Sequence, residues 1–191
     1  MLYNDFVKFL LWFLSAEGVF MSDGQSIQIG KIEKSMDNYK YVYLSGYNKF
    51  NKIGNWLEKQ SSIFKTEVEN TKFRKPNFKR GQIIKVDFGV NVGSELSNSH
   101  FAIVLNSDDN TSVDNLTVIP LTSKKGYKRI YIGNVLKDFE KFKKYNNKGY
   151  ALITQITTIS KKRIMNTNVR SYCTKEVMDI ITKNIHEYLS K

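Results

Sequence analysis

Two segments of this chain carry residue types that can do chemistry on a phosphate group. His100 stands where a loop rich in Gly, Ser and Asn, residues 89–99, enters the apolar run Phe101–Leu105. A histidine side chain can move protons near neutral pH. A second apolar run ends in two hydroxyl residues and continues into four cations, namely Thr122, Ser123, Lys124, Lys125, Lys128 and Arg129. Because hydroxyls donate hydrogen bonds to phosphate oxygens and cations neutralise the charge of a pentacoordinate transition state, we expect a phosphate site there.

Each segment also has a plain structural interpretation. A single histidine is more often part of the fold than of a reaction, and a Thr-Ser turn followed by lysines is also typical of a solvated surface loop. Residue types alone therefore leave a catalytic and a structural interpretation open, both for His100 and for the segment 122–129.

The charge of the chain narrows the class of partner. Its 191 residues include 30 Lys and Arg against 18 Asp and Glu, a formal net charge of +12. Residues 1–76 contribute +3 (11 basic, 8 acidic) and residues 77–191 contribute +9 (19 basic, 10 acidic). This favours a polyanionic partner, which could be a nucleic acid, an acidic membrane surface or an acidic protein, although a basic surface can also serve solubility.

Metal and disulfide chemistry are not expected. Cys173 is the single cysteine and the chain has two histidines, so neither an intrachain disulfide nor a zinc cluster of usual spacing can form. The sequence therefore predicts a protein without a metal or another cofactor, in a reducing cytoplasm. With 41% apolar residues, the chain can bury one good core and is not fibrous or disordered.

The first 20 residues are a doubtful segment. The apolar run 6–14 contains Lys8 and has about half of the ~20 residues that a membrane-spanning helix needs, so no membrane partner is expected. Its flanks make a poor signal peptide. Residues 17–21 can also be encoded by a purine-rich ribosome-binding sequence followed by a start codon. We therefore hypothesise that translation begins at Met21 and that residues 1–20 are an over-long gene start.

Helical periodicity marks the next part, residues 21–76. Apolar residues recur at spacings of three and four from Ile29 to Tyr43, which predicts a helix that ends near Gly46. A second stripe predicts a helix over about 49–70. We expect these helices to form a helical hairpin, followed by a basic linker over 71–79. The hairpin could inhibit the second domain, provide a dimerisation surface or only pack.

Residues 77–191 change to a strand pattern and form the expected second domain. Five short runs rich in β-branched and aromatic residues are Gln82–Phe88, Phe101–Leu105, Leu116–Pro120, Arg129–Ile132 and Tyr150–Ile156. Their spacing favours a small barrel or strongly coiled sheet. A surface helix or ordered loop is expected over Val135–Tyr145, and a closing helix after the cap residue Thr174. The predicted fold class is mainly β with helices (α+β).

Four blocks of this region resemble the MazF/PemK family of ribonuclease toxins in order and spacing. The blocks are Arg80–Gly89, Gly93–Leu96 with Phe101–Asn106, Val118–Ser123 and Gln155–Ile164. The resemblance covers about residues 79–190. It implies an SH3-like small barrel with a C-terminal helix, a homodimer, a cognate antitoxin partner, and sequence-specific, metal-independent cleavage of single-stranded RNA such as mRNA.

The resemblance assigns catalytic positions to His100, Thr122 and Ser123. His100 and Phe101 stand where the family has a catalytic Arg followed by Pro. A His there can act as general base on the RNA 2′-hydroxyl or as general acid to the leaving 5′-oxygen, which keeps cleavage to a 2′,3′-cyclic phosphate. Alternatively, loss of the guanidinium leaves a non-catalytic module that binds RNA or protein. A third alternative is a toxin on the same fold that acts on DNA gyrase.

Binding and positioning roles follow from the same resemblance. RNA phosphates are expected on Arg80, Lys124, Lys125, Lys128 and Arg129, and the loop before His100 is expected to be positioned by Gly93, Ser94, Glu95 and Gln155. Exposed aromatic residues such as Phe88 and Tyr127 are expected to stack on unpaired bases. Because the two hydroxyls and this supply of cations are present, we expect cleavage to be retained with His100.

Overall fold

The computed structural model describes residues 22–69, 76–133, 148–166 and 171–190. These residues belong to two compact units, Met1–Asn51 and Lys52–Lys191. The doubtful segment 1–20, the helix or loop expected over 135–145 and most of the expected linker lie outside the described residues. The division into an extension that ends at residue 76 and a domain that starts at residue 77 stays a prediction.

The first unit contains α2, Asp23–Leu44, and the short 3-10 helix η1, Asn48–Phe50. α2 begins with a capping box, in which the Ser22 hydroxyl accepts from the Gln25 amide and the Gln25 side chain accepts from the Ser22 amide. The helix ends before Gly46, whose φ of 70° is a left-handed conformation that favours glycine. The first helix predicted from periodicity is thereby confirmed.

The second unit begins with α3, Ile53–Val68, which confirms the second predicted helix. Its first expected turn is the separate 3-10 helix η1, which belongs to the first unit. Ile53 is the buried residue of α3, and the rest of the helix is half-buried or exposed. The arrangement of α2 and α3 as a hairpin stays a prediction.

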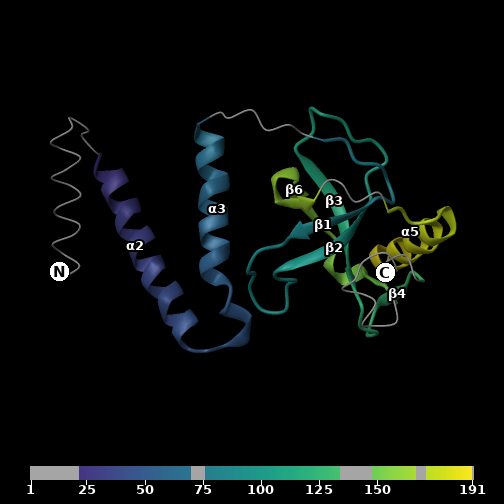
Figure 1. Cartoon of the computed structure of the whole chain (residues 1–191), viewed down its shortest axis with the longest axis horizontal. Coiled ribbons are helices and arrows are strands. Elements are labelled where there is room, and N and C mark those ends of the chain that lie inside the picture. Colours follow the sequence, from purple (N-terminus) through teal and green to yellow (C-terminus); the bar gives the residue numbers. More distant parts are fainter. Residues whose placement is uncertain (1–21, 70–75, 134–147, 167–170, 191) are drawn as a thin grey trace. The chain divides into compact units, whose positions relative to one another are not determined.

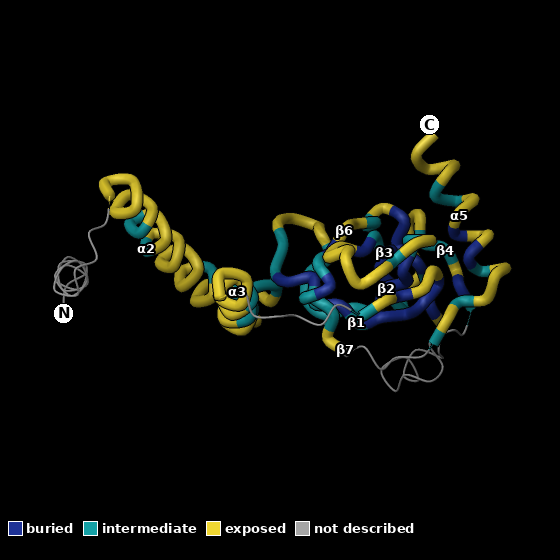
Figure 2. The backbone as a smooth tube through the Cα atoms, turned by 90° about the horizontal axis from the view of Figure 1, so that it is seen from above, coloured by how far each residue is buried: buried dark blue, intermediate teal, exposed yellow. Residues whose placement is uncertain are grey.

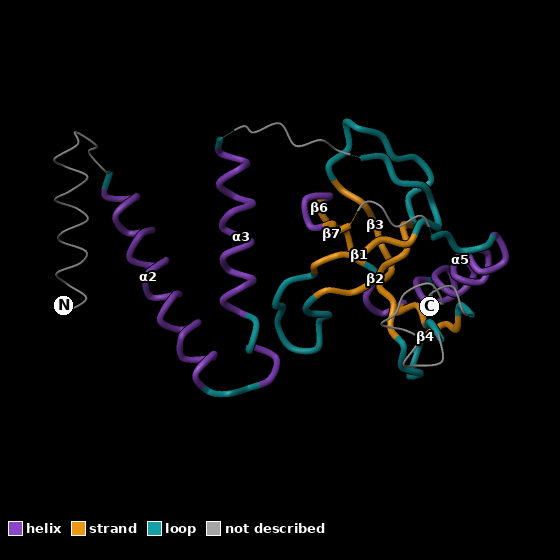
Figure 3. The backbone as a smooth tube through the Cα atoms, viewed as in Figure 1, coloured by secondary structure: helices purple, strands orange, loops and turns teal. Residues whose placement is uncertain are grey.

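The described part of the second unit forms a seven-stranded antiparallel sheet. Its strands are β1 Ile83–Asp87, β2 Ser99–Val104, β3 Asn115–Thr122, β4 Arg129–Tyr131, β5 Tyr150–Leu152, β6 Thr157–Ser160 and β7 Ile164–Asn166. The hydrogen-bonded order is β4-β5-β3-β2-β1-β7, and β6 pairs with β3. Figures 1 and 3 show the strands of this unit gathered beside α5. Between the described strands no pairing joins β4 to β7, so the predicted small barrel is open.

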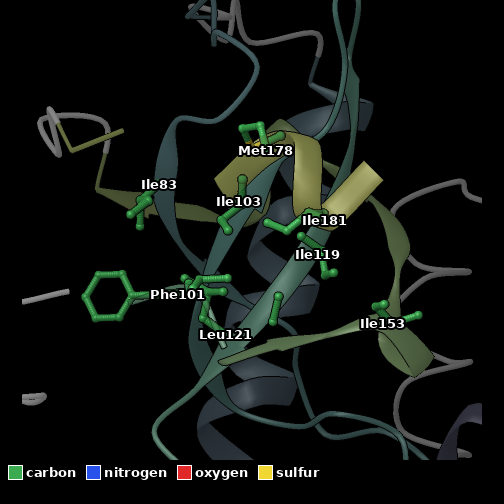
Figure 4. Close-up of a cluster of buried hydrophobic side chains, with 10 residues drawn as sticks. Ile83, Phe101, Ile103, Ile119, Leu121, Ile153, Met178 and Ile181 are labelled. Atoms are coloured by element: carbon green, nitrogen blue, oxygen red, sulfur yellow. The ribbon is translucent and has the colours of Figure 1, made fainter. Parts of the chain in front are cut away.

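Both faces of this sheet are buried, because successive residues of a strand point to opposite sides. One face packs against α5, Lys175–Leu189, and we call its cluster the α5-side core; its members include Ile83, Phe101, Ile103, Ile119, Leu121, Met178 and Ile181 (Figure 4). The other face forms the Phe78-side core, whose members include Phe78, Ile84, Val86, Phe88, Ala102, Val104, Leu116 and Val118. Figure 2 shows the buried residues gathered along the strands. The two cores explain why these strands read as near-continuous apolar runs.

The C-terminal part differs from the sequence prediction in its strands but not in its helix. The predicted strand Tyr150–Ile156 is wrong after Leu152, where the 3-10 helix η2, Ile153–Gln155, interrupts it. β6 and β7 were not predicted, because β6 is stabilised by pairing with the distant strand β3 and exposes two threonines. The predicted cap of α5 is confirmed, since the Thr174 hydroxyl accepts from the Val177 amide at 3.4 Å.

A buried ion pair ties three distant segments together beside the Phe78-side core. The Lys161 Nζ lies 2.7 Å from the Asp109 Oδ1, and both side chains are 1% exposed. The same ammonium group donates to the Asn110 carbonyl at 2.9 Å, and the second Asp109 oxygen accepts from the Phe78 amide at 2.8 Å. These contacts offset part of the cost of burying two polar side chains where water is excluded.

Candidate functional site

His100 and Thr122 lie on neighbouring strands, at the same end of the sheet and on the same face. The last pair that joins β2 to β3 is Ala102 with Pro120. Two residues beyond that pair stand His100 on β2 and Thr122 on β3. An even step keeps a side chain on its own face, so both share the face of Ala102, which belongs to the Phe78-side core. The structure thus brings together two residues that are far apart in the sequence.

The two strands separate at this end of the sheet. Beyond the last β2–β3 pair, His100 pairs with Val86 of β1, while Thr122 pairs with Tyr150 of β5. Pro120 marks the point of separation, since proline has no amide hydrogen with which to continue a ladder. The side chains of His100 and Thr122 therefore stand beyond the last pair that joins β2 to β3.

His100 is half-buried and lies against an aromatic ring. Its imidazole meets the Phe88 ring edge-on, with ring centroids 6.5 Å apart and an interplanar angle of 62°. Phe88 itself is 3% exposed and belongs to the Phe78-side core. The expectation that Phe88 is an exposed aromatic that stacks on a base is therefore wrong, because the ring is used to pack the core beside His100. Tyr127, by contrast, is 82% exposed.

The segment after Thr122 folds into a compact cationic turn. The Thr122 hydroxyl accepts from the Lys124 amide at 3.3 Å, and the Arg129 guanidinium donates to the Lys124 carbonyl at 3.0 Å. Gly126 allows this arrangement, because a Cβ at that position would lie 2.9 Å from the Arg129 Nε. Ser123 is half-buried and Lys125 is exposed. The hydroxyls and cations predicted as one site are therefore neighbours in space as well as in sequence.

Lys128 and Arg129, at the end of this turn, lie beside the C-terminal helix α5. The Lys128 Nζ lies 4.4 Å from the centre of the Tyr188 ring of α5, which is a cation–π contact. Together with Asn184, Glu187 and two isoleucines, these residues line a pocket of about 280 Å³. Lys124 and Lys125 are exposed and stand closer in sequence to Thr122, so they are the cations best placed for a phosphate bound at that hydroxyl.

The loop between β1 and β2 holds the predicted positioning residues. Gly93, Ser94 and Glu95 are exposed at its tip, and Gly93 has a φ of 56°. Gln155 contacts the loop directly, since its side-chain oxygen accepts from the Leu96 amide at 3.2 Å. Asn91, which sequence reasoning missed, donates to the Leu96 carbonyl at 2.7 Å and to the Phe88 carbonyl at 3.0 Å.

A polar cleft of about 550 Å³ lies between this loop and β6. Its lining residues are Phe88, Asn91, Glu95, Leu96, Thr154, Gln155, Ile156, Thr157, Thr158, Ile159, Ser160 and Arg163. Arg163 was not among the predicted site residues. It ends a Lys-Lys-Arg run, in which the sequence does not distinguish the three cations. In the structure Lys161 is buried, Lys162 pairs with Glu67 of α3, and Arg163 lines the cleft.

Arg80 is not brought to the His100 end of β2. Its guanidinium donates to the Leu105 carbonyl and, at 2.8 Å, to the Thr182 hydroxyl of α5. Leu105 follows the opposite end of β2, roughly 17 Å from His100 at the usual rise of a strand. The hydrogen bonds of Arg80 attach the start of β1 to α5. A phosphate-binding role for Arg80 stays a prediction.

Neither a metal site nor a membrane span was found in the ranges that the structure describes. There, no group of three or more His, Cys, Asp or Glu residues could hold a metal ion. Within the same ranges, no helix has both the length and the apolar character needed to cross a bilayer.

Fold and site define an open antiparallel barrel with a polar site where two strands diverge. The family described as PemK-like, MazF-like toxin of type II toxin-antitoxin system matches residues 79–189. This chain belongs to that family, since the match covers more than half of its length. α2 and α3 precede the matched region.

Solved structures of low sequence identity resemble the chain. A MazF from Deinococcus radiodurans is 15% identical, with a TM-score of 0.47, over 61% of this chain and 99% of that chain. An endoribonuclease in complex with its cognate antitoxin from a Mycobacterial species is 17% identical, with a TM-score of 0.43, over 59% of this chain and 95% of that chain. No curated protein matches the chain in sequence.

Proposed function

We propose that this protein is the toxin of a toxin–antitoxin pair and acts as a metal-independent endoribonuclease that cuts single-stranded RNA at a short motif. The proposal is carried by one observation. His100 and Thr122 stand on the same face at the diverging ends of β2 and β3, and a cationic turn follows at once. Membership of the PemK-like, MazF-like family supports the toxin role.

Cleavage begins with attack of an RNA 2′-oxygen on the adjacent phosphorus. A bond forms between that oxygen and the phosphorus, and the bond from the phosphorus to the 5′-oxygen breaks. His100 acts either as the base that takes the 2′-hydroxyl proton or as the acid that protonates the leaving oxygen. The products are a 2′,3′-cyclic phosphate and a 5′-hydroxyl end.

The other residues bind the phosphate. The Thr122 hydroxyl already accepts from the Lys124 amide, so its proton remains available to a non-bridging phosphate oxygen. Ser123 helps to position the same phosphate, and the exposed Lys124 and Lys125 supply positive charge as the transition state forms. Flanking phosphates are held by Lys128 and Arg129, which makes RNA binding dependent on salt.

The partners belong to the same proposal. A cognate antitoxin would neutralise the protein by placing an acidic or apolar segment over the cationic surface. We also propose a homodimer that works in the cytoplasm. Among the described helices none could span a membrane.

The experiment is to incubate the full chain with a long single-stranded RNA in the presence of EDTA and to map the new ends. We compare wild type with His100→Ala and Thr122→Ala. The matched controls are His186→Ala, which removes the other histidine from an exposed position on α5, and Thr117→Ala, which removes a threonine from the other end of β3. A substrate with a single 2′-deoxy nucleotide at the cut site tests the nucleophile.

We expect cuts at a recurring motif that both site variants lose and both controls keep. Cleavage is lost when the 2′-hydroxyl is absent, and the products carry cyclic phosphate ends. Intact RNA with salt-sensitive binding would instead establish a non-catalytic module. If RNA is neither cut nor bound, the result favours a toxin that acts on another target, such as DNA gyrase.

A further inference from the structure

α3 contacts the loop between β1 and β2, although the helix lies outside the region that matches the family. Trp56 packs on Gly89 of the loop, Lys59 pairs with Asp87 at the end of β1, and Glu67 pairs with Lys162 after β6. Spacings of three and eleven residues place them on one face of a helix with 3.6 residues per turn. α3 therefore presents one continuous face to the rest of its unit.

Trp56 packs on the first residues of the loop. Its ring covers Gly89, where an added Cβ would lie only 2.5 Å from the Trp56 Cε2. Gly89 has a φ of 83°, so both its conformation and its close approach to the indole require glycine. The start of the loop is thus shaped to receive this side chain.

An ion pair fixes the same end of the loop. The Lys59 Nζ lies 2.8 Å from the Asp87 Oδ2, and both side chains are largely covered, at 33% and 19% exposed. The other oxygen of Asp87 accepts from the Gly89 amide at 3.1 Å. One carboxylate therefore connects α3 to the last residue of β1 and to the first turn of the loop.

Arg163 carries the contact from Trp56 to the cleft. The Arg163 guanidinium carbon lies 4.9 Å from the centre of the Trp56 ring, and its Nη1 donates to the Phe88 carbonyl at 3.1 Å. The same carbonyl accepts from Asn91. The Arg163 guanidinium and the Asn91 amide thereby hold the backbone where the loop leaves β1. Trp56 in turn holds the Arg163 guanidinium in place through the cation–π contact.

α3 does not fill the cleft. All the residues that line the 550 Å³ cleft lie between Phe88 and Arg163 in the sequence, so α3 supports its wall from outside. A segment that blocked the cleft would contribute lining residues to it. This placement favours support of the cleft wall by α3 over blockage of the cleft.

We infer that α3 is a built-in brace for the loop between β1 and β2, and that Trp56 and Arg163 are positioning residues for the site at His100. The functional half of this inference rests on the proposed ribonuclease activity. Its structural half does not, because it concerns how firmly α3 holds residues 89–98. The brace fixes the loop that carries Glu95 and leads into His100, and a site works only when its loop is held in place.

The test combines hydrogen exchange of the full chain with RNA cleavage. In Trp56→Ala we expect the amides of residues 89–98 to exchange about tenfold faster, while those of β3 stay protected. We expect kcat/KM for RNA to fall about tenfold. Trp56→Phe keeps an aromatic face for Arg163 and should recover most of both readouts.

Matched variants separate the brace from general damage to α3. Phe64→Ala removes an aromatic side chain that is 56% exposed on α3, and it should change neither readout. Lys59→Ala should act like a weaker Trp56→Ala, whereas Lys65→Ala, which removes a lysine paired to Glu69 just after the end of α3, should not. Lys59→Ala also serves as the second test if Trp56→Ala fails to fold.

The possible results decide between the alternatives. The brace is overturned if the amides of residues 89–98 exchange hydrogen at the wild-type rate in both Trp56→Ala and Lys59→Ala. Faster exchange with unchanged or increased cleavage overturns the positioning role, and increased cleavage would make α3 an inhibitory element. If wild type does not cut RNA, the proposed function fails, and the exchange data alone then decide whether the brace exists.

Discussion

His100 of β2 and Thr122 of β3 both stand two residues beyond the pair formed by Ala102 and Pro120, on the face of the Phe78-side core. The β2–β3 ladder ends before these two residues, and each of them stays paired on its other side, His100 with Val86 of β1 and Thr122 with Tyr150 of β5. The ladders to β1 and β5 therefore hold the backbone of both residues in place. That geometry suits a group that must approach a substrate atom without moving far.

The His100→Arg variant tests what the histidine contributes. Imidazole changes its charge near neutral pH, whereas guanidinium keeps its charge. In the pH range where proton transfer by His100 limits the rate, we expect wild-type RNA cleavage to change about tenfold per pH unit. We expect His100→Arg to cleave RNA with a nearly flat profile between about pH 5.5 and 8.5. The measurement is the single-turnover cleavage rate at each pH. An identical profile in wild type and His100→Arg would show that His100 moves no proton.

Removal of Lys124 and Lys125 should weaken RNA binding and make it less dependent on salt. Each phosphate contact to a single strand contributes about 0.7 to the slope of log K against log salt. In the Lys124→Ala/Lys125→Ala double variant we therefore expect the slope to become shallower by about 1.4. The control is Lys31→Ala/Lys34→Ala, which removes the same charge from exposed positions on α2. Equal losses in the two variants would mean that net charge, and not a local site, drives binding.

Lys161→Met should destabilise the second unit strongly. The variant leaves the Asp109 carboxylate buried without its cation, and breaking a buried pair in this way costs about 3–5 kcal/mol. Lys162→Met removes the next lysine, whose partner Glu67 is 51% exposed, and should cost about 1 kcal/mol or less. The free energy of unfolding is measured with urea.

The same pair allows a sharper comparison. Lys161→Met combined with Asp109→Leu removes both charges and should recover much of the lost stability, because no unpaired charge remains. A double variant as unstable as Lys161→Met alone would indicate that the hydrogen bonds to Asn110 and Phe78, rather than the ion pair, matter most.

Gly89→Ala should be costly because of Trp56. The new Cβ would meet the indole at 2.5 Å and would also force a φ of 83° on alanine. We expect a loss of about 3 kcal/mol in the free energy of unfolding, of which about 1 kcal/mol is backbone strain. Gly133→Ala, at a φ of 75° and with no atom of the described residues within 4 Å of the added Cβ, should show the strain alone.

In a Trp56→Ala background the steric part should disappear. There, Gly89→Ala is expected to cost about as much as Gly133→Ala, about 1 kcal/mol. Additive losses from Gly89→Ala and Trp56→Ala would mean that the two residues are not in contact in solution.

Cys173 should be a poor target for alkylation. Burial raises the pKa of its thiol to about 12 from 9.0, because an ionised sulfur would lose its hydration. Only the thiolate reacts, so below pH 9 we expect iodoacetamide to modify native Cys173 about a thousandfold more slowly than an exposed thiol. The measurement is the mass shift with time in native and urea-unfolded protein. Fast modification of native protein would contradict the burial.

Elements whose signals are local could be predicted from the amino-acid sequence. The periodicity of α2 and α3, the glycine after α2 and the Thr174 cap of α5 each depend on residues within a few positions of one another, so they could be predicted. The cationic turn after Thr122 was predicted for the same reason. Its hydroxyls and cations are adjacent in the chain, and proximity needs no fold to create it.

Contacts between residues far apart in the sequence could not be predicted in this way. Lys161 belongs to a basic run that reads as solvent-exposed, yet Asp109 and the Phe78-side core bury it. Arg163, two residues later, is held by Trp56 of α3, about 100 residues earlier in the chain. The register of β2 with β3 likewise places His100 and Thr122 on one face at the same end of the sheet. Such contacts depend on strand register and side-chain packing, which are set by the summed burial of many residues and leave no local pattern in the sequence.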